Sequence, residues 1–157
     1  MKASSIQELK QELNETNAAD LRQLCLRLAK FKIENKELIS YLLFNAHDEA
    51  GYIDAVKNLI DEEFLELPKP NTYLTKKSLR KILRIANKHI KYMGSKQADA
   101  TIRIHFCHQM KLSKIPFQKT AVLKNLYQQQ LKNIATAIAG LHEDLQYDFQ
   151  QELNQLQ

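Results

Sequence analysis

Apolar side chains recur at every third or fourth position along almost the whole chain, and this spacing constrains the fold more than any other feature. Residues three and four apart share one face of an α-helix, so each such run predicts an amphipathic helix. Three glycines and three prolines in 157 residues leave little room for the turns of a β-sandwich. The chain is therefore predicted to be all-α. Helices are expected to begin near Ser4 or Ser5, Asn17, Asn35, Asp48, Thr75, Ser95 and Gln118.

About seven to eight helices are expected, because the last apolar pattern either divides at Gly140 or continues as one helix. Residues 21–36 and 79–96 are faintly alike, each with a Leu-Arg helix followed by a capped helix that begins with lysine. Such repetition is typical of antiparallel helical hairpins that stack as in an α-solenoid. A compact helical bundle is the alternative.

The length predicts one helical domain over residues 1–157, since a chain of this size can bury a sizeable core. Pro68 and Pro70 stop the helical pattern, because proline lacks a backbone donor and disfavours helix in the residue before it. The sequence therefore suggests sub-halves 1–67 and 75–157, joined by the Pro68–Pro70 loop.

Composition and cysteine usage indicate a globular protein of the cytoplasm. Charged residues make up 26% of the chain and interrupt every apolar run, and no apolar signal-like stretch follows the first residues. Cys25 and Cys107 lie in apolar helical stretches without the spacing of a disulfide framework. Both are expected to be reduced, buried thiols.

Several short stretches resemble a known family. Residues 27–31 (RLAKF), 35–38 (NKEL), 41–44 (YLLF) and 92–96 (YMGSK) look like a small uncharacterised family of bacterial helical proteins. The resemblance covers most of the chain. It implies a bacterial, cytoplasmic, all-helical protein with no assigned activity, and it transfers no functional residue.

Histidines are the main candidates for metal chemistry. His105 and His108 share a helix face, yet a metal site would need a further ligand such as His47 or His89 from another segment. The alternative is a half-buried pair beside Cys107. The His47-Asp48 dipeptide resembles the metal-binding pair of HD phosphohydrolases but lacks that family's upstream histidine, so Asp48 is expected to cap a helix instead. We predict no catalytic, metal or cofactor site.

The charge distribution gives the strongest pointer to a partner. Residues 69–124 carry fourteen lysines and arginines against one acid, Asp99. Within the helix expected at 76–93, cations recur every three or four positions and form a stripe about 20 Å long, which matches successive phosphates of a nucleic acid. The acidic helix at 48–67 is the competing partner, and it would neutralise the stripe internally. The stripe consists of Lys77, Lys81, Arg84, Lys88 and Lys91, widened by Arg80.

Two functional hypotheses follow from these observations. The absence of recognisable chemistry, together with the hairpin-like helices, favours a non-enzymatic interaction module that binds another protein or itself. The alternative is non-specific binding of RNA or DNA phosphates through the stripe. Neither a membrane nor a small-molecule substrate is expected as a partner.

Overall fold

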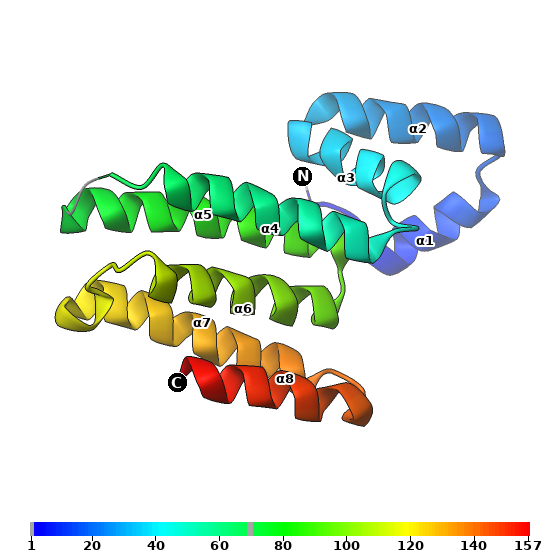
Figure 1. The fold of residues 1–157 in the computed structure, drawn as a ribbon. Helices are drawn as coiled ribbons and strands as arrows, with labels where there is room; N and C mark the ends of the chain where they lie inside the picture. The colour runs from blue at the N-terminus through cyan, green and yellow to red at the C-terminus, as the bar shows by residue number, and fades with distance from the viewer. Residues whose placement is uncertain (1, 69–70) are drawn as a thin grey trace. The chain divides into compact units, whose positions relative to one another are not determined.

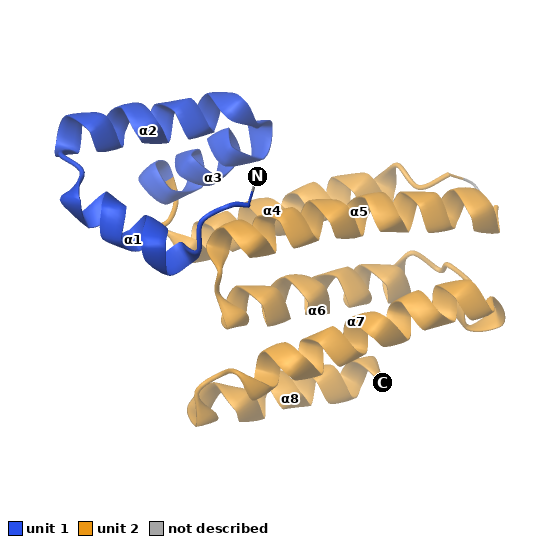
Figure 2. Cartoon of the chain, turned by 180° about the vertical axis from the view of Figure 1, so that it is seen from behind, with its two compact units in different colours: residues 1–44 blue, residues 45–157 orange. Residues whose placement is uncertain are grey.

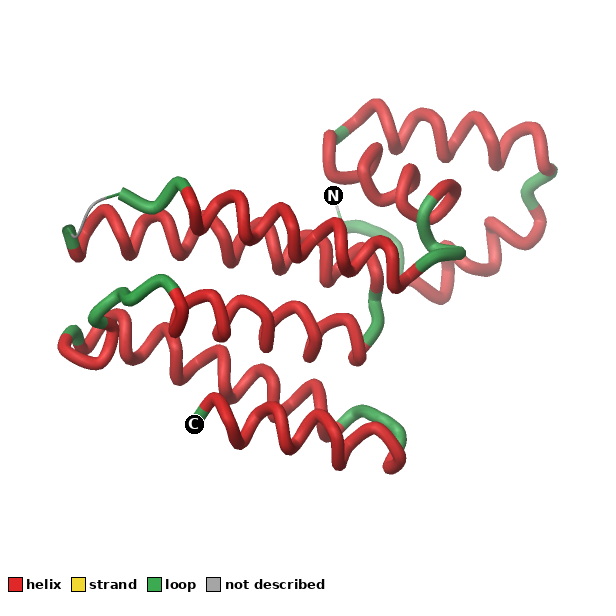
Figure 3. Tube along the Cα trace, viewed as in Figure 1, coloured by secondary structure: helices red, strands yellow, loops and turns green. Residues whose placement is uncertain are grey.

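The computed structural model describes residues 2–68 and 71–157, and these ranges form helices joined by short connections (Figure 3). They contain eight α-helices, one short 3₁₀ helix and no strand, which confirms the all-α prediction. Lys69 and Pro70 of the predicted Pro68–Pro70 loop lie outside the described residues. The helices are α1 (Ile6–Glu15), α2 (Ala18–Phe31), α3 (Ile33–Phe44), α4 (Glu49–Leu65), α5 (Thr72–Met93), α6 (Lys96–Leu112), α7 (Ala121–Ala139) and α8 (Glu143–Leu156), with the 3₁₀ helix η1 at Phe117–Lys119.

The chain divides into two compact units, residues 1–44 and residues 45–157 (Figure 2). Unit 1 contains α1 to α3, and unit 2 contains α4 to α8. The division follows Phe44, whereas the sequence placed its sub-halves on either side of Pro68.

Capping side chains set the beginning of four helices where the sequence predicts them. Each accepts a hydrogen bond from the backbone N–H three residues further on, which satisfies a donor that the first turn leaves unpaired. These caps are Ser5, Asn17, Asp48 and Ser95.

Two helices begin earlier than expected. Helix α3 begins at Ile33 and not near Asn35, and α5 begins at Thr72 because the Asn71 side chain accepts from two backbone N–H groups. The prediction that Thr75 caps α5 is wrong. Thr75 lies inside the helix and is 6% exposed, so its side chain belongs to the buried face.

Unit 1 has almost no buried interior. Helices α2 and α3 pack against each other, and the Asn35 side-chain amide donates to the Leu28 carbonyl oxygen at 2.9 Å. Tyr41 is the one buried side chain among the described residues of this unit, and α1 and α2 bury none. Helix α3 has a wide apolar face, yet within unit 1 only α2 packs against it, and Leu43 stays 66% exposed.

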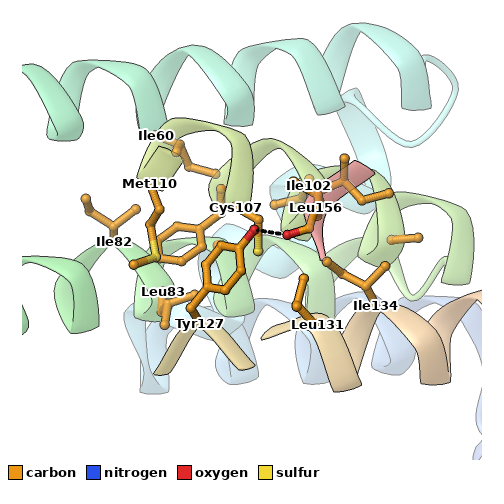
Figure 4. Packing of buried hydrophobic residues seen from close by; sticks show 14 of the residues in the cluster. Ile60, Ile82, Leu83, Ile102, Cys107, Met110, Tyr127, Leu131, Ile134 and Leu156 are labelled. Carbon is orange, nitrogen blue, oxygen red and sulfur yellow. Dashed lines mark hydrogen bonds between the residues drawn. The ribbon is translucent and has the colours of Figure 1, made fainter. Parts of the chain in front are cut away.

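Unit 2 contains the hydrophobic core, built around α6. This helix lies between the α4/α5 hairpin and the α7/α8 hairpin and contacts all four helices (Figure 1). The Phe106 ring of α6 packs against the Phe64 ring of α4 with centroids 5.5 Å apart. Figure 4 shows side chains of several helices meeting in this core. Unit 2 is thus a stack of helical hairpins, as the sequence predicts.

Glycines end two helices at the predicted places. Gly94 closes α5 in the left-handed conformation (φ 62°), which glycine adopts at little cost, and Ser95 caps α6 at once. Gly140 ends α7, so the last apolar pattern forms two helices and not one.

The two cysteines have opposite environments. Cys107 is fully buried in unit 2, and burial raises the pKa of its thiol to about 12. Cys25 is exposed. The prediction of two buried thiols is therefore wrong for Cys25, because this residue lines a groove between α2 and α3 that is open to solvent.

None of the helices in the described ranges combines the length and the apolar character that crossing a membrane requires.

Candidate interaction surfaces

Helix α5 carries the predicted stripe on the side opposite its buried seam. Leu79, Ile82 and Ala86 are at most 1% exposed and fix the orientation of the helix in unit 2. That orientation leaves most of the stripe in solvent. Lys77, Arg80, Lys81, Arg84 and Lys91 are exposed, and Lys88 is half-buried.

The acidic helix α4 neutralises only part of the stripe. The Lys81 ammonium lies 2.7 Å from the Glu63 carboxylate, which is the pairing that the sequence left open. The side chain of Lys81 is still 57% exposed, so this pair contributes at most about 1 kcal/mol to stability. Among the described residues, no carboxylate lies within 4 Å of the charged groups of Lys77, Arg80 or Arg84.

The unpaired cations line a hollow on one face of α5. It is open to solvent, has a volume of about 540 Å³, and is lined only by residues of α5. None of the described residues that line it is acidic. The lining residues are Tyr73, Lys76, Lys77, Arg80, Leu83, Arg84 and Asn87.

A second hollow, of about 480 Å³, lies between α5 and α7. It shares Lys76, Arg80 and Leu83 with the first, so the two hollows adjoin along these side chains. Its α7 side includes the neutral amides of Asn125 and Gln129, and again no acid. We call the two together the α5 hollow. The polar lining therefore passes from the cations of α5 to uncharged amides of α7 that can form hydrogen bonds.

Among the α5 residues of this hollow, two polar residues and one aromatic residue were not predicted from the sequence. Lys76 stood outside the four-three spacing of the stripe, Tyr73 preceded the predicted start of the helix, and Asn87 is uncharged. The signal that would have found them is the set of positions three and four apart that begins at Tyr73, once Asn71 is accepted as the cap.

The histidines lie in separate places on unit 2. His105 Nε2 is 2.6 Å from Asp61 Oδ1, and His89 Nδ1 is 2.7 Å from the Tyr52 hydroxyl oxygen. His108 is half-buried on α6, while His47 is exposed in the connection before α4. Within residues 2–68 and 71–157, no three His, Cys, Asp or Glu side chains are grouped closely enough to hold a metal ion.

Unit 1 presents an unusual amount of apolar surface. Eleven large apolar side chains among residues 2–44 are at least 40% exposed, against six in the described part of unit 2. Monomeric soluble proteins rarely expose contiguous apolar patches larger than a few hundred Å². We call these eleven side chains the unit 1 apolar surface. They are Ile6, Leu9 and Leu13 of α1, Leu24, Leu26, Leu28 and Phe31 of α2, and Ile33, Leu42, Leu43 and Phe44 of α3.

A small groove runs between the two packed helices of unit 1. It has a volume of about 260 Å³, and its walls are mainly apolar side chains of α2 and α3. Leu28 and Leu42 belong both to this groove and to the unit 1 apolar surface.

Comparisons with protein-family models, with curated proteins and with solved structures find no match to this chain. The resemblance to a bacterial helical family and the cytoplasmic location stay predictions.

Proposed function

We propose that this protein is a non-enzymatic helical interaction module that associates with protein through the unit 1 apolar surface. One observation carries the proposal: unit 1 exposes eleven large apolar side chains and buries only Tyr41 among its described residues. Burial of apolar side chains is the main force that stabilises a fold, and a segment of about 40 residues rarely obtains enough of it alone. We therefore expect a protein partner to bury the unit 1 apolar surface.

The size and charge of the surface favour a second copy of the chain as that partner. The exposed fractions of the eleven side chains add up to about six fully exposed ones, or on the order of 1,000 Å² at roughly 150–200 Å² each. A standard protein interface takes about 800 Å² from each partner. Residues 1–44 contain seven basic and six acidic residues, so two copies would hardly repel each other.

Light scattering coupled to size-exclusion chromatography tests this proposal. The full chain is expected to elute above its monomer mass, and Leu28→Glu with Phe31→Glu is expected to reduce the mass to that of a monomer. Leu65→Glu with Leu112→Glu is the matched control, because these side chains are 87% and 71% exposed but lie in unit 2. A monomeric full chain would reject self-association. An oligomer that persists in the unit 1 variant would reject this surface.

We infer a second candidate function, the binding of nucleic-acid phosphates by α5. The specific observation in its favour is the hollow lined by cations that have no carboxylate partner in the described part of the chain. Electrophoretic retardation of RNA or DNA at low salt tests it, with binding expected to weaken as salt rises because bound phosphates release counterions. Unretarded RNA and DNA at low salt would reject it.

A further inference from the structure

We propose that the α5 hollow binds single-stranded nucleic acid, with the Tyr73 ring as a stacking platform for a base and the neighbouring cations as phosphate contacts. This inference rests on the second candidate function and narrows it to one form of nucleic acid. A single strand differs from a duplex in that the faces of its bases are exposed. The Tyr73 ring in the hollow is a group on which such a face can stack.

Tyr73 is the group suited to a base face. Its side chain is 72% exposed in the first turn of α5, where it adds nothing to the core. It lines the same hollow as Lys76 and Lys77, which lie three and four residues further along the helix and so on the same face. An aromatic ring beside cations is the arrangement by which proteins bind unpaired bases and the adjoining backbone.

The cations suit a phosphate backbone. Tyr73 and Arg84 are eleven residues apart, or about 16 Å along the helix axis, a length that spans a few nucleotides. Guanidinium groups bind phosphate oxygens in a bidentate manner, and the hollow holds both Arg80 and Arg84. None of the described residues that line the hollow is acidic, so no carboxylate would repel a phosphate backbone bound along it.

Neutral amides favour nucleic acid over an acidic peptide. Asn125 and Gln129 line the α7 side, where amide groups can donate to and accept from the edges of unstacked bases. A peptide rich in carboxylates would use the cations and the N–H donors of the amides, but it would leave the Tyr73 ring and the amide oxygens unused. A duplex would also leave Tyr73 unused, because its base faces are stacked on one another.

Fluorescence anisotropy of the full chain with a short labelled oligouridine tests the inference. Tyr73→Ala is expected to weaken binding on the order of tenfold, and Tyr73→Phe to retain it, because stacking needs the ring and not the hydroxyl. Tyr147→Ala is the matched control, since Tyr147 is 70% exposed on α8, away from the hollow.

The salt dependence tests the cations independently. Arg80→Gln with Arg84→Gln is expected to reduce the slope of log binding constant against log salt by about 1.4, the value for two single-strand phosphates. Lys10→Gln with Lys132→Gln removes the same charge from exposed positions outside the hollow and is expected to leave the slope unchanged. Circular dichroism of each variant confirms that its helices are intact.

The outcomes separate the inference from the function on which it rests. If no nucleic acid binds at low salt, the second candidate function and this inference both fail. If a duplex of the same length binds as tightly as the single strand, or if Tyr73→Ala binds as the unsubstituted chain does, only this inference fails. Polyglutamate that competes as well as unlabelled oligouridine would also overturn it, in favour of an acidic protein as the partner.

Discussion

Removal of one buried hydroxyl, in Tyr127→Phe, tests how the last helix is held on the core. The Tyr127 hydroxyl donates to the Leu156 carbonyl oxygen at 2.7 Å and so joins α7 to the end of α8 (Figure 4). Burial raises the pKa of Tyr127 well above its usual value, so the group remains a donor at neutral pH. Phenylalanine keeps the ring, which stacks on Phe117 with centroids 4.7 Å apart. The substitution therefore isolates the hydrogen bond.

The expected loss follows from the burial of both partners. Tyr127 is 2% exposed and Leu156 is fully buried, so the carbonyl oxygen gains no easy replacement from water. Loss of one partner of a buried hydrogen bond costs about 1–2 kcal/mol of the free energy of unfolding. For a unit the size of residues 45–157, that corresponds to a fall in Tm of at least about 4 °C.

Urea unfolding of the full chain, followed by far-UV circular dichroism, measures this loss. Tyr147→Phe serves as the control, because Tyr147 is exposed and its substitution should change the free energy of unfolding by less than about 0.5 kcal/mol. The Tyr127 variant should show the lower midpoint and an unchanged slope. Equal midpoints for the two variants would refute the assignment of this hydrogen bond as a stabilising contact.

Three further predictions concern other parts of the chain. A thiol-specific reagent near pH 8 should modify Cys25 rapidly and Cys107 only on unfolding, because Cys107 is buried with a thiol pKa of about 12; equal labelling rates would contradict the described burial. Gly94→Ala should cost about 1 kcal/mol in urea unfolding, all of it backbone strain at φ 62°, since an added Cβ meets no atom within 4 Å. Hydrogen bonds from Ser5 lower the pKa of Glu8, so the Ser5–Glu8 capping box should be complete above the ordinary value of 4.5 and lost as the pH falls through the lowered one. NMR titration of the Ser5 amide checks this, and a midpoint at or above 4.5 would contradict it.

Helix positions were largely predictable because their signals are local. A capping side chain and the apolar pattern that follows it lie within a few residues of each other, so Ser5 and Ser95 were identified without any tertiary information. Asn71 and Thr75 show the limit of this reasoning. Both residue types cap helices well, and the choice between them depends on the core, which buries the Thr75 side chain.

The cover over an apolar face was not predictable from periodicity. The apolar pattern of α3 identifies an apolar face, but it does not indicate whether another helix packs against that face. In the structure, Leu42 and Leu43 remain exposed. The candidate site has the same limit. Spacing along α5 placed Lys81 and Arg84 on one stripe, but the rotation of α5 against α4 decides that Lys81 meets Glu63 and that Arg84 lines the hollow.

A segment with a single buried side chain has a conformational stability that depends on its surroundings. By mass action, a ligand for folded unit 1 adds about 2.7 kcal/mol when present at a hundred times its dissociation constant. The folded fraction of helices α1 to α3 would then depend on the concentration of their binding partner. A chain without its partner would unfold locally and be cleaved first by proteases. If unit 1 associates as proposed, its exposed leucines would match the abundance of this protein to that of its complex.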